Sequence, residues 1–560
     1  MDQTYREDPC NNLQEVIKSA AENPSQHWIG YVNPEGKVMR QSYAMLYENA
    51  LDILAQMHGK GMQKGDYLII AAESNYEILN YLWAAILGGI IPTVLQPPVG
   101  FLVQNPAAEK LIKVYKLLDS PWVYLPKGIH DNTPGIDPKR IINGTEQSAK
   151  TGKARVCCSE PGDIAYLQFS SGSTGDPKGI ILSHKNIIIN IDAISEALRF
   201  TPDDTTCNWM PLYHDMGLIG YHFTPIYLTH NQLHIETTDF IKDPYLWLRI
   251  LSEERVNITG CPNFGQALIN RHIKRKPLPA LDLSALRGIL NGAEPISPEI
   301  MENFMENLLP HGLAPGAMMP VYGMAEATLA ITFSELGEKP VIRSFNPTRL
   351  SGEGRAIPEN DHTVPVHRIV NVGRPLRGIT LTIRNKKGDR LEEGEVGEIC
   401  IQGETLFRGY FSTSAETKAE GEPGGFRTGD QGFLFEGALY ITGRYKDIIF
   451  IHGKNYYAND LEAYAIRECD LVYGKFIIGG YPDRAKGRDS IIAFLAGSDN
   501  ENTRIKFEQI AALFSRNMGI HIDHFVVIKS NQIHKTSSGK IKRYRIIQDF
   551  LEGRHHEIQL

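Results

Sequence analysis

An alternation of apolar segments near the start of the chain places the strongest constraint on its fold. Residues 67–72 and 90–95 are short apolar runs typical of buried strands, and residues 76–87 between them have a helical pattern. Two strands joined through a helix run parallel, because the helix returns the chain to the start of the sheet. The sequence therefore predicts an α/β core with a parallel sheet. Helices with one apolar face are predicted over 13–20 and 43–57.

The chain is also longer than one hydrophobic core usually supports. It has 560 residues, so two or more domains are expected. Past Tyr445 the pattern changes to short strands separated by helices, which predicts a small α+β domain of about a hundred residues. The strands are expected at 448–451, 475–478, 490–495 and 525–528, and the helices at 459–468 and 504–516.

Composition favours small ligands in a reducing cytoplasm. A net charge of −7 gives no electrostatic case for nucleic acid or an anionic membrane, and the basic residues 271–276 are interpreted as a solvated helix end. Seven scattered cysteines without a CxxC pair predict neither a disulfide framework nor a zinc site. The polar, acidic start is unlike a signal peptide, and the apolar stretch 79–95 is short for a bilayer span and contains Gly88, Gly89 and Pro92.

A loop rich in glycine and hydroxyl groups lies between two apolar runs, 164–167 and 180–182. Its backbone N–H groups, its hydroxyls and an ammonium group can all donate to phosphate oxygens. A surface loop is the alternative, but buried strands on both sides would hold the loop on a rigid scaffold. Ser183 is expected to cap the helix that follows. The expected phosphate-binding residues are Ser170, Ser171, Gly172, Ser173, Thr174, Gly175 and Lys178.

The spacing of this loop does not fit the Walker A motif, so a P-loop NTPase is disfavoured. The run from Phe169 to Gly179 instead resembles the phosphate-binding signature of the adenylate-forming superfamily. That resemblance implies a large α/β N-terminal domain with parallel sheets and a β-rich subdomain, followed by a small, mobile α+β C-terminal domain. The implied division is 1–444 and 445–560.

Further segments match the superfamily in its own order. By this resemblance, residues 291–295 and 319–326 contact the adenine, with Tyr322 stacked on the base and Glu326 binding Mg²⁺. A buried core aromatic and a solvated helix residue are the alternatives for these two side chains. The nucleotide residues implied here are Gly292, Ala293, Glu294, Tyr322, Gly323, Met324 and Ala325.

The last matching segments lie at the junction of the two implied domains and near the C-terminus. By resemblance, Asp430 accepts hydrogen bonds from both ribose hydroxyls, Arg444 contacts the ribose side of the nucleotide and Lys446 is the hinge. Lys540 corresponds to the catalytic lysine. His534 replaces the family's usual proline, a departure expected to alter loop rigidity more than chemistry.

The implied chemistry is attack of an acyl carboxylate on the α-phosphorus of ATP. Because two anions meet, the site must supply positive charge along the line of attack. Lys540 would bridge the carboxylate and the α-phosphate, and Mg²⁺ on Glu326 would neutralise phosphate oxygens. ATP and Mg²⁺ are therefore the expected cofactors.

Two segments point to a subgroup. Residues 209–220 resemble the acyl-site motif of fatty acyl-AMP ligases, with Asp215 as its distinctive residue and His214 at the mouth of the acyl pocket. A buried histidine, or a metal pair with His222, is the alternative for His214. Tyr213 and Met216 complete the expected pocket residues.

The segment 343–367 corresponds to an insertion that, in this subgroup, is thought to hinder rotation of the C-terminal domain and so transfer to coenzyme A. An ordinary surface loop is the alternative. The sequence is thus interpreted as a fatty acyl-AMP ligase that supplies an acyl carrier protein acting in trans. An acyl-CoA synthetase is the second candidate, and a catalytically silent nucleotide or acyl sensor is the third. Acyl chain length, the identity of the carrier and the oligomeric state stay open.

Overall fold

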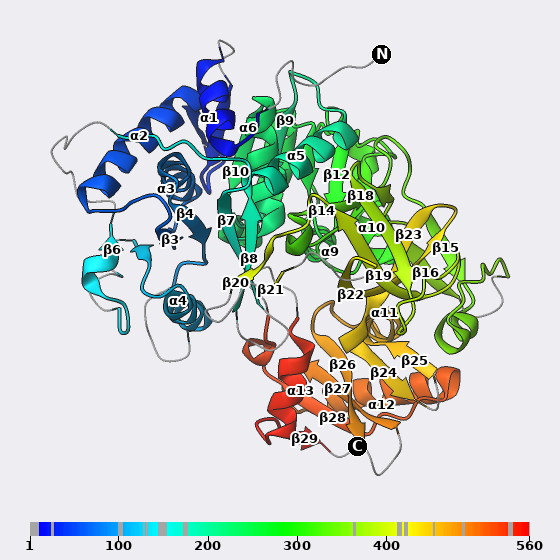
Figure 1. The fold of residues 1–560 in the computed structure, drawn as a ribbon. Helices are drawn as coiled ribbons and strands as arrows, with labels where there is room; N and C mark the ends of the chain where they lie inside the picture. Colours follow the sequence, from blue (N-terminus) through cyan, green and yellow to red (C-terminus); the bar gives the residue numbers. More distant parts are fainter. Residues whose placement is uncertain are drawn as a thin grey trace.

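Two sheets with parallel strands form the centre of the N-terminal part of the chain (Figure 1). The fold is given by a computed structural model. It describes residues 10–23, 27–98, 105–126, 129, 133–143, 154–171, 177–361, 366–411, 417–418, 424–451, 454–483, 488–535 and 541–558, with the backbone alone at 170–171, 417–418 and 454–455. Among these residues no helix is both long and apolar enough to cross a bilayer.

The first parallel sheet contains the strands predicted near the N-terminus. Its order is β4-β3-β5-β6, with β3 (Tyr67–Ile70), β4 (Ile91–Val94), β5 (Trp122–Tyr124) and β6 (Ile141–Ile142), all parallel. The predicted helices are present as α1 (Leu13–Glu22), α2 (Tyr43–Gly59) and α3 (Asn75–Gly88), and α4 (Pro106–Leu117) follows. The side chains of Ser42 and Ser74 cap α2 and α3, so local sequence fixes where these helices begin.

The second sheet has nine strands in the order β17-β14-β13-β12-β11-β9-β10-β1-β2, and its central six strands are parallel. The strands are β1 (Trp28–Val32), β2 (Val38–Ser42), β9 (Thr205–Asn208), β10 (Asn231–Ile235), β11 (Ile258–Gly260), β12 (Gly288–Asn291), β13 (Met318–Gly323), β14 (Ala330–Phe333) and β17 (Arg374–Pro375). The intervening helical elements are α5 (His184–Leu198), η3 (Met216–Phe223), α6 (Thr224–Leu228), α7 (Thr237–Lys242), α8 (Pro244–Glu253), α9 (Asn263–Ile273), α10 (Pro298–Leu308), η4 (Leu309–His311) and η5 (Ala325–Ala327).

The strands around the predicted phosphate loop are β7 (Ile164–Ser171) and β8 (Pro177–Ser183). They pair antiparallel as a hairpin, and β20 (Gly409–Phe411) and β21 (Thr417–Lys418) extend the sheet to β21-β20-β8-β7. Unlike the strands of the first sheet, β7 and β8 are therefore not parallel, because a connection this short cannot form the crossover that parallel strands need. The capping role predicted for Ser183 is confirmed: its hydroxyl accepts from the backbone N–H of Asn186 at the start of α5.

The stretch 126–162, rich in glycine, proline and polar residues, contains a strand of the first sheet. Within its described residues, η2 (Pro138–Arg140) leads into the buried strand β6, which adds an edge to the first sheet. The strand forms because Ile141 and Ile142 bury their side chains against β5.

The predicted insertion, 343–367, contains more structure than a loop. The strand β15 (Ile342–Phe345) pairs antiparallel with β16 (His367–Val370), and η6 (Arg349–Glu353) lies between them. Phe345 is fully buried against Phe433 and Tyr440, with ring centroids 5.0 and 5.6 Å away. Residues 362–365 lie outside the described part. The insertion is thus packed on the antiparallel sheet β18-β19-β22-β23, formed by β18 (Ile379–Arg384), β19 (Gly397–Gly403), β22 (Phe426–Phe435) and β23 (Ala438–Arg444).

The remaining residues form the lower lobe of Figure 1, shown in yellow to red. Its described strands and helices confirm the predicted α+β pattern, with a mixed sheet in the order β26-β27-β28-β29, a β24-β25 hairpin and the helices α11, α12 and α13. The lobe has hydrophobic clusters of its own, including Phe476, Phe507 and Phe514. The elements are η7 (Tyr445–Asp447), β24 (Ile448–Ile451), β25 (Lys454–Tyr457), α11 (Ala458–Glu468), β26 (Phe476–Asp483), β27 (Arg488–Ala496), α12 (Glu501–Met518), β28 (His524–Ile528), η8 (Ser530–Gln532), α13 (Arg543–Leu551) and β29 (Glu557–Ile558).

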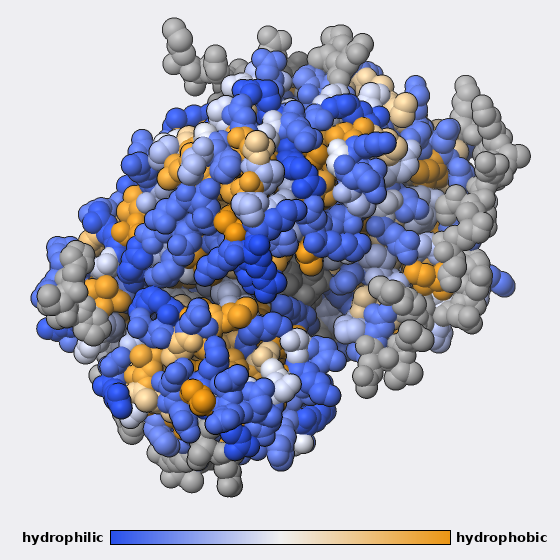
Figure 2. Space-filling view, turned by 180° about the vertical axis from the view of Figure 1, so that it is seen from behind, coloured by the Kyte–Doolittle hydropathy of each residue, from blue (hydrophilic) through white to orange (hydrophobic). Residues whose placement is uncertain are grey.

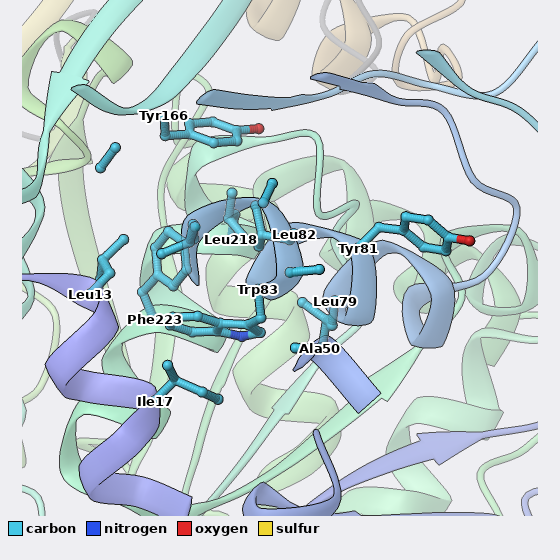
Figure 3. Close-up of a cluster of buried hydrophobic side chains, with 14 of the residues drawn as sticks. Leu13, Ile17, Ala50, Leu79, Tyr81, Leu82, Trp83, Tyr166, Leu218 and Phe223 are labelled. Atoms are coloured by element: carbon cyan, nitrogen blue, oxygen red, sulfur yellow. The ribbon is translucent and has the colours of Figure 1, made fainter. Parts of the chain in front are cut away.

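The hydrophobic core of the upper part joins elements that are far apart in sequence. Figure 3 shows Leu13 and Ile17 of α1 facing Trp83 of α3 and Phe223 of η3, with Tyr166 of β7 above them. On the outside, Figure 2 shows hydrophobic side chains in small patches among hydrophilic ones, several of them on the lower lobe. The core therefore fixes the hairpin β7–β8 against α1, α3 and η3.

Candidate active site

The hairpin β7–β8 carries the expected phosphate loop. Gly172, Ser173, Thr174 and Gly175 lie outside the described residues, and only the backbone of Ser170 and Ser171 is described, at the end of β7. Lys178 is an exposed residue of β8, and its ammonium lies 4.9 Å from the ring centroid of Tyr410 on β20. This cation–π contact places the positive charge beside the next strand of the same sheet.

Tyr410 connects Lys178 to Glu326. Its hydroxyl donates a hydrogen bond of 2.9 Å to Oε1 of Glu326, the residue expected to bind Mg²⁺. Burial raises the pKa of Glu326, and the negative charge of Asp215 raises it further, while the bond from Tyr410 opposes this shift. The hairpin, β20 and η5 therefore place an ammonium group and a partly buried carboxyl group on the two sides of one tyrosine.

The expected acyl-pocket residues lie at the start of η3. Nδ1 of His214 lies 2.7 Å from Oδ1 of Asp215, and the backbone N–H of Met216 donates to the same carboxylate oxygen at 2.7 Å. Asp215 thus caps η3 and contacts His214. The backbone carbonyl of Tyr213 accepts from Nε2 of Gln168 on β7 at 3.0 Å, which ties this motif to the phosphate hairpin.

Two other features of this motif explain its residue types. A Cβ atom at position 217 would come within 2.3 Å of the Pro211 carbonyl oxygen, so only Gly217 allows the chain to turn this closely. The side chain of Met216 is buried in the core of the nine-stranded sheet. The side chain of Tyr213 is partly buried against the other core, which contains Trp83 and Phe223. His222, the other half of the alternative metal pair, is fully buried and accepts from the indole N–H of Trp83 at 2.8 Å.

The structure brings Tyr322, Asp430 and Arg444 together from three strands. The Tyr322 hydroxyl donates to Oδ2 of Asp430 at 2.7 Å, and Nε of Arg444 donates to Oδ1 at 3.0 Å. Asp430 and Arg444 are partners in the β22–β23 register. Burial, followed by the charge of Asp430, raises the pKa of Tyr322 well above its usual range. Both oxygens of one buried carboxylate are therefore engaged by neighbours that the sequence had already singled out.

The segment Gly292–Ala293–Glu294 follows β12, as expected. Gly292 approaches the carbonyl oxygen of Val321 so closely that a Cβ atom would lie 2.7 Å from it, and Ala293 has a φ of 69°. Oε1 of Glu294 accepts from the backbone N–H of Phe264 at 2.5 Å, in the first turn of α9. The loop thus crosses the carboxyl ends of β12 and β13, where ligands commonly bind in α/β sheets. Gly323, Met324 and Ala325 continue from β13 into η5 on the same side.

Lys540 lies outside the described residues, but its flanking residues are described. Lys535 and Ile541 form a β-bridge, and the backbone N–H of Lys542 donates to the His534 carbonyl at 2.8 Å. The charge of Glu294 acts on Lys535, and that of Lys113 acts on Lys542. Charges of the N-terminal part thus contribute to the pKa of a lysine on each flank of residues 536–540. Nε2 of His534, the residue noted as a departure from the resembled motif, lies 2.6 Å from Oδ2 of Asp549.

The predicted hinge residue, Lys446, lies in η7 between β23 and β24. Beside it, Asp447 forms an ion pair of 3.1 Å with the buried guanidinium of Arg543, which also contacts Glu462 at 2.9 Å. Pairing with these two carboxylates raises the pKa of Arg543 despite its burial. The start of α13 is thus anchored directly to η7, which contains Lys446.

Three residues that the sequence analysis did not select belong to this region. They are Tyr410, Lys110 of α4, whose ammonium donates to the Phe169 carbonyl at 3.1 Å, and Glu236, whose charge raises the pKa of Tyr213 and which accepts from the backbone N–H of Asn75 at 2.8 Å. Burial raises the pKa of Glu236 to about 7. Nothing in their local sequence marks them, because each lies in an ordinary helix, strand or loop and becomes notable only through distant partners.

The donor set fits magnesium better than a transition metal. Among the described residues no three His, Cys, Asp or Glu side chains form a cluster. Glu326 offers a hard carboxylate oxygen, and Mg²⁺ commonly binds through one or two carboxylates together with substrate phosphates and water.

Comparisons with known proteins concern the chain as a whole. Residues 17–411 match the family model described as AMP-binding enzyme. The medium-chain-fatty-acid–[acyl-carrier-protein] ligase JamA of Moorena producens is 29% identical over 93% of this chain and 91% of its own. FadD25 of Mycobacterium tuberculosis, provisionally named a fatty-acid–CoA ligase, is 27% identical over 90% and 91%. A solved structure from a study of fatty acyl-adenylate ligases of E. coli and L. pneumophila has a TM-score of 0.88 at 28% identity, covering 98% of this chain and 99% of that one.

Proposed function

The chain belongs to the AMP-binding enzyme family of adenylate-forming ligases, and on this premise we propose that it activates a medium- or long-chain fatty acid for an acyl carrier protein. ATP and the acid would give acyl-adenylate and pyrophosphate, and the acyl group would then pass to the phosphopantetheine thiol of the carrier. The observation that carries the proposal is that Tyr410 joins Lys178 to Glu326, and that the charge of Asp215, which contacts His214, raises the pKa of the same Glu326.

The nucleotide side rests on Asp430. In the proposal its two carboxylate oxygens accept from the two ribose hydroxyls, while Tyr322 and Arg444 fix the orientation of the carboxylate. The ring of Tyr322 and the loop of Gly292, Ala293 and Glu294 would border the adenine, because they lie at the carboxyl ends of β13 and β12.

The phosphate side rests on the hairpin β7–β8. Its loop residues and Lys178 would hold the β- and γ-phosphates, and Glu326 would bind Mg²⁺ through its carboxylate. Magnesium would neutralise charge on the phosphate oxygens during the transfer. Tyr410 would keep the Glu326 carboxyl group ionised and oriented, since its hydroxyl donates to the ionised form.

In the chemical step, a carboxylate oxygen of the acid attacks the α-phosphorus and the bond to the β-phosphate oxygen breaks. Lys540 would bridge the two anions in this step, delivered by a C-terminal domain of residues 445–560 that turns on Lys446. His214 and Asp215 would border the acid at the start of η3. Positioning and charge stabilisation supply most of the catalysis in such transfers.

The proposed preference for a carrier protein over coenzyme A rests on the insertion. Its strands β15 and β16 are anchored by the buried ring of Phe345, and His367 on β16 pairs with Asp460 of α11 in the C-terminal part. An insertion fixed at both sides would leave Lys540 in place for adenylation and would resist the later rotation about Lys446 that transfer to coenzyme A needs. JamA, whose name specifies a carrier protein, supports the same preference.

A coupled assay tests the function and its two alternatives. Pyrophosphate release is measured with ATP, Mg²⁺ and saturated acids of increasing length, followed by addition of either coenzyme A or a carrier protein bearing phosphopantetheine. We expect acid-dependent pyrophosphate release and acylation of the carrier. Abundant acyl-CoA would identify an acyl-CoA synthetase, and no release with any acid, despite ATP binding, would indicate a silent sensor.

A further inference from the structure

A buried chain of polar side chains begins just after the acyl-site motif 209–220. His222 of η3 is fully buried, and its Nε2 accepts from the indole N–H of Trp83 at 2.8 Å. Figure 3 shows Trp83 beside Phe223, the next residue of η3, and the two ring centroids lie 5.6 Å apart. On its other side, Nδ1 of His222 lies 2.8 Å from Oε1 of Gln232 on β10. The last turn of η3 is therefore attached to a strand of the nine-stranded sheet.

The same chain continues along β10 to the start of the motif. Nε2 of His234 lies 2.8 Å from Oε1 of Gln232, and Nδ1 of His234 lies 3.5 Å from Nδ2 of Asn208, its partner in the β9–β10 register. Asn208 binds both backbone groups of Met210, since its Oδ1 accepts from the N–H at 2.9 Å and its Nδ2 donates to the carbonyl at 2.8 Å. One chain of hydrogen bonds thus joins Met210 to His222, at the two ends of the segment that contains the expected acyl-site residues.

The hydrogen-bonding capacity of each side chain fixes the protons in this chain. The indole of Trp83 can only donate, so Nε2 of His222 accepts and Nδ1 carries the proton that is donated to Gln232. The amide N–H of Gln232 donates to the Tyr43 hydroxyl at 2.8 Å, which leaves Oε1 to accept from both imidazoles. Burial lowers the pKa of His222 to about 4 and also lowers that of His234, so both rings are neutral. A satisfied polar network of this kind inside a core is rigid.

The segment held between these two ends turns tightly. The backbone N–H of His214 donates to the Pro211 carbonyl at 3.0 Å, and Gly217 lies against the same carbonyl. η3 ends in a wide turn, because the N–H of Thr224 bonds to the carbonyl of Ile219, five residues earlier. Such π-helical turns are rare and occur frequently at functional sites. The direction of the His214 side chain therefore depends on where the two ends of the segment are held.

We propose that His222, Gln232 and His234 are positioning residues for the acid. Through hydrogen bonds to both ends of the segment 210–222, they hold the residues that border the acid in the proposed function, on which this inference rests. The residues proposed to bind the nucleotide lie on other strands, β13, β22 and β23. Breaking the chain should therefore weaken binding of the acid and leave binding of the nucleotide unchanged.

Titration calorimetry of the full chain with dodecanoic acid, and separately with AMP, tests this role. His234→Phe removes the link between Gln232 and Asn208. We expect it to weaken acid binding about tenfold, the free energy of one hydrogen bond. AMP affinity should stay at the wild-type value, which also shows that the variant is folded. His234→Gln keeps a side-chain N–H donor and should retain most of the acid affinity.

Tyr43→Phe is the matched control. Tyr43 and His234 each have 1% of their surface exposed, and the Tyr43 hydroxyl also bonds to Gln232, but on a branch outside the chain. Tyr43→Phe should lower Tm and leave acid affinity unchanged. Equal losses of acid affinity in Tyr43→Phe and His234→Phe would overturn the positioning role, because general destabilisation would then explain both.

A second variant keeps the test decisive. If His234→Phe no longer binds AMP, Asn208→Leu replaces it, since this change removes the hydrogen bonds to Met210 at the other end of the chain and should weaken acid binding to the same extent. Unchanged acid affinity in a variant that binds AMP, or no acid binding by the wild type, would overturn the inference. Acid binding without pyrophosphate release would instead count against the proposed function.

Discussion

Nε2 of His367 lies 3.2 Å from Oδ1 of Asp460, and this contact joins the insertion to helix α11 of the C-terminal part. Both side chains are largely shielded from solvent, with 21% and 34% of their surface exposed. Burial alone would lower the pKa of His367, but the carboxylate of Asp460, with a contribution from Glu299 of α10, raises it above the ordinary value of 6.5. The strength of this contact between the N-terminal and C-terminal parts therefore depends on pH.

The first prediction concerns the stability of this contact. Because the folded pKa of His367 is raised, its ion pair stabilises fully below pH 6.5 and is lost as pH rises through the folded value. Asp460→Asn should therefore lower Tm by about 2 °C at pH 6 and by less at pH 9. Calorimetric scans of both proteins across this range measure the difference. Glu508→Gln, an exposed residue of α12, serves as the control, and an equal effect at both pH values would exclude the ion pair.

The second prediction concerns the carboxyl group proposed to bind Mg²⁺. Removal of the hydroxyl in Tyr410→Phe takes away the bond that lowers the pKa of Glu326, so this already raised pKa should rise further. The low-pH limb of the plot of pyrophosphate-release rate against pH should then move to higher pH. The rate should also increase less when Mg²⁺ is added. The exposed Tyr544→Phe should leave the profile in place. If the profile of Tyr410→Phe matches the wild type, Glu326 does not control this limb.

The third prediction concerns nucleotide affinity. Tyr322→Phe leaves Oδ2 of Asp430 without its 2.7 Å donor inside a buried site. ATP affinity should fall about tenfold, the effect of losing one hydrogen bond to a charged group, while the KM for the acid changes little. Steady-state kinetics with ATP and acid varied in turn separate the two constants. A rise confined to the acid KM would place Tyr322 on the acyl side instead.

The fourth prediction concerns Lys540, the proposed catalytic lysine. Lys540→Ala should reduce acyl-adenylate formation by a factor on the order of a thousand, because the positive charge between the two reacting anions is lost. ATP should still bind, since Asp430 and Tyr322 are intact. Single-turnover formation of acyl-adenylate, together with ATP titration, measures both effects. Lys387→Ala, an exposed lysine, is the control, and near-normal pyrophosphate release by Lys540→Ala would remove Lys540 from this role.

The fifth prediction concerns a polar network inside the core. Oε1 of Gln232 lies 2.8 Å from both His222 and His234, and its amide donates to the Tyr43 hydroxyl at 2.8 Å. Gln232→Leu would remove one hydrogen-bond partner from each of these three buried groups and should destabilise the fold by about 3 kcal/mol. Thermal unfolding measures this loss against the exposed Gln63→Leu. If a calorimetric scan gives Gln232→Leu a Tm within about one degree of that of Gln63→Leu, water replaces the hydrogen bonds of the Gln232 amide.

Local sequence predicted the elements well where its signals act over a few residues. The serines that cap α2, α3 and α5 and the apolar face of α1 mark these helices directly. The order of motifs also identified the residues that gather around Asp430, although it could not show that Tyr322 and Arg444 engage one carboxylate oxygen each. That geometry depends on the register of β22 with β23 and on a contact 108 residues apart.

The sequence by itself determined the α/β class, the position of most helices and strands and the family, because these follow from short-range periodicity, capping and ordered motifs. Only the tertiary structure decided that β7 and β8 pair antiparallel, that the insertion packs through Phe345, and that Tyr410 and Lys110 join the site. The reason is physical: these features depend on the free energy of contacts between distant segments, which no local pattern of residues contains.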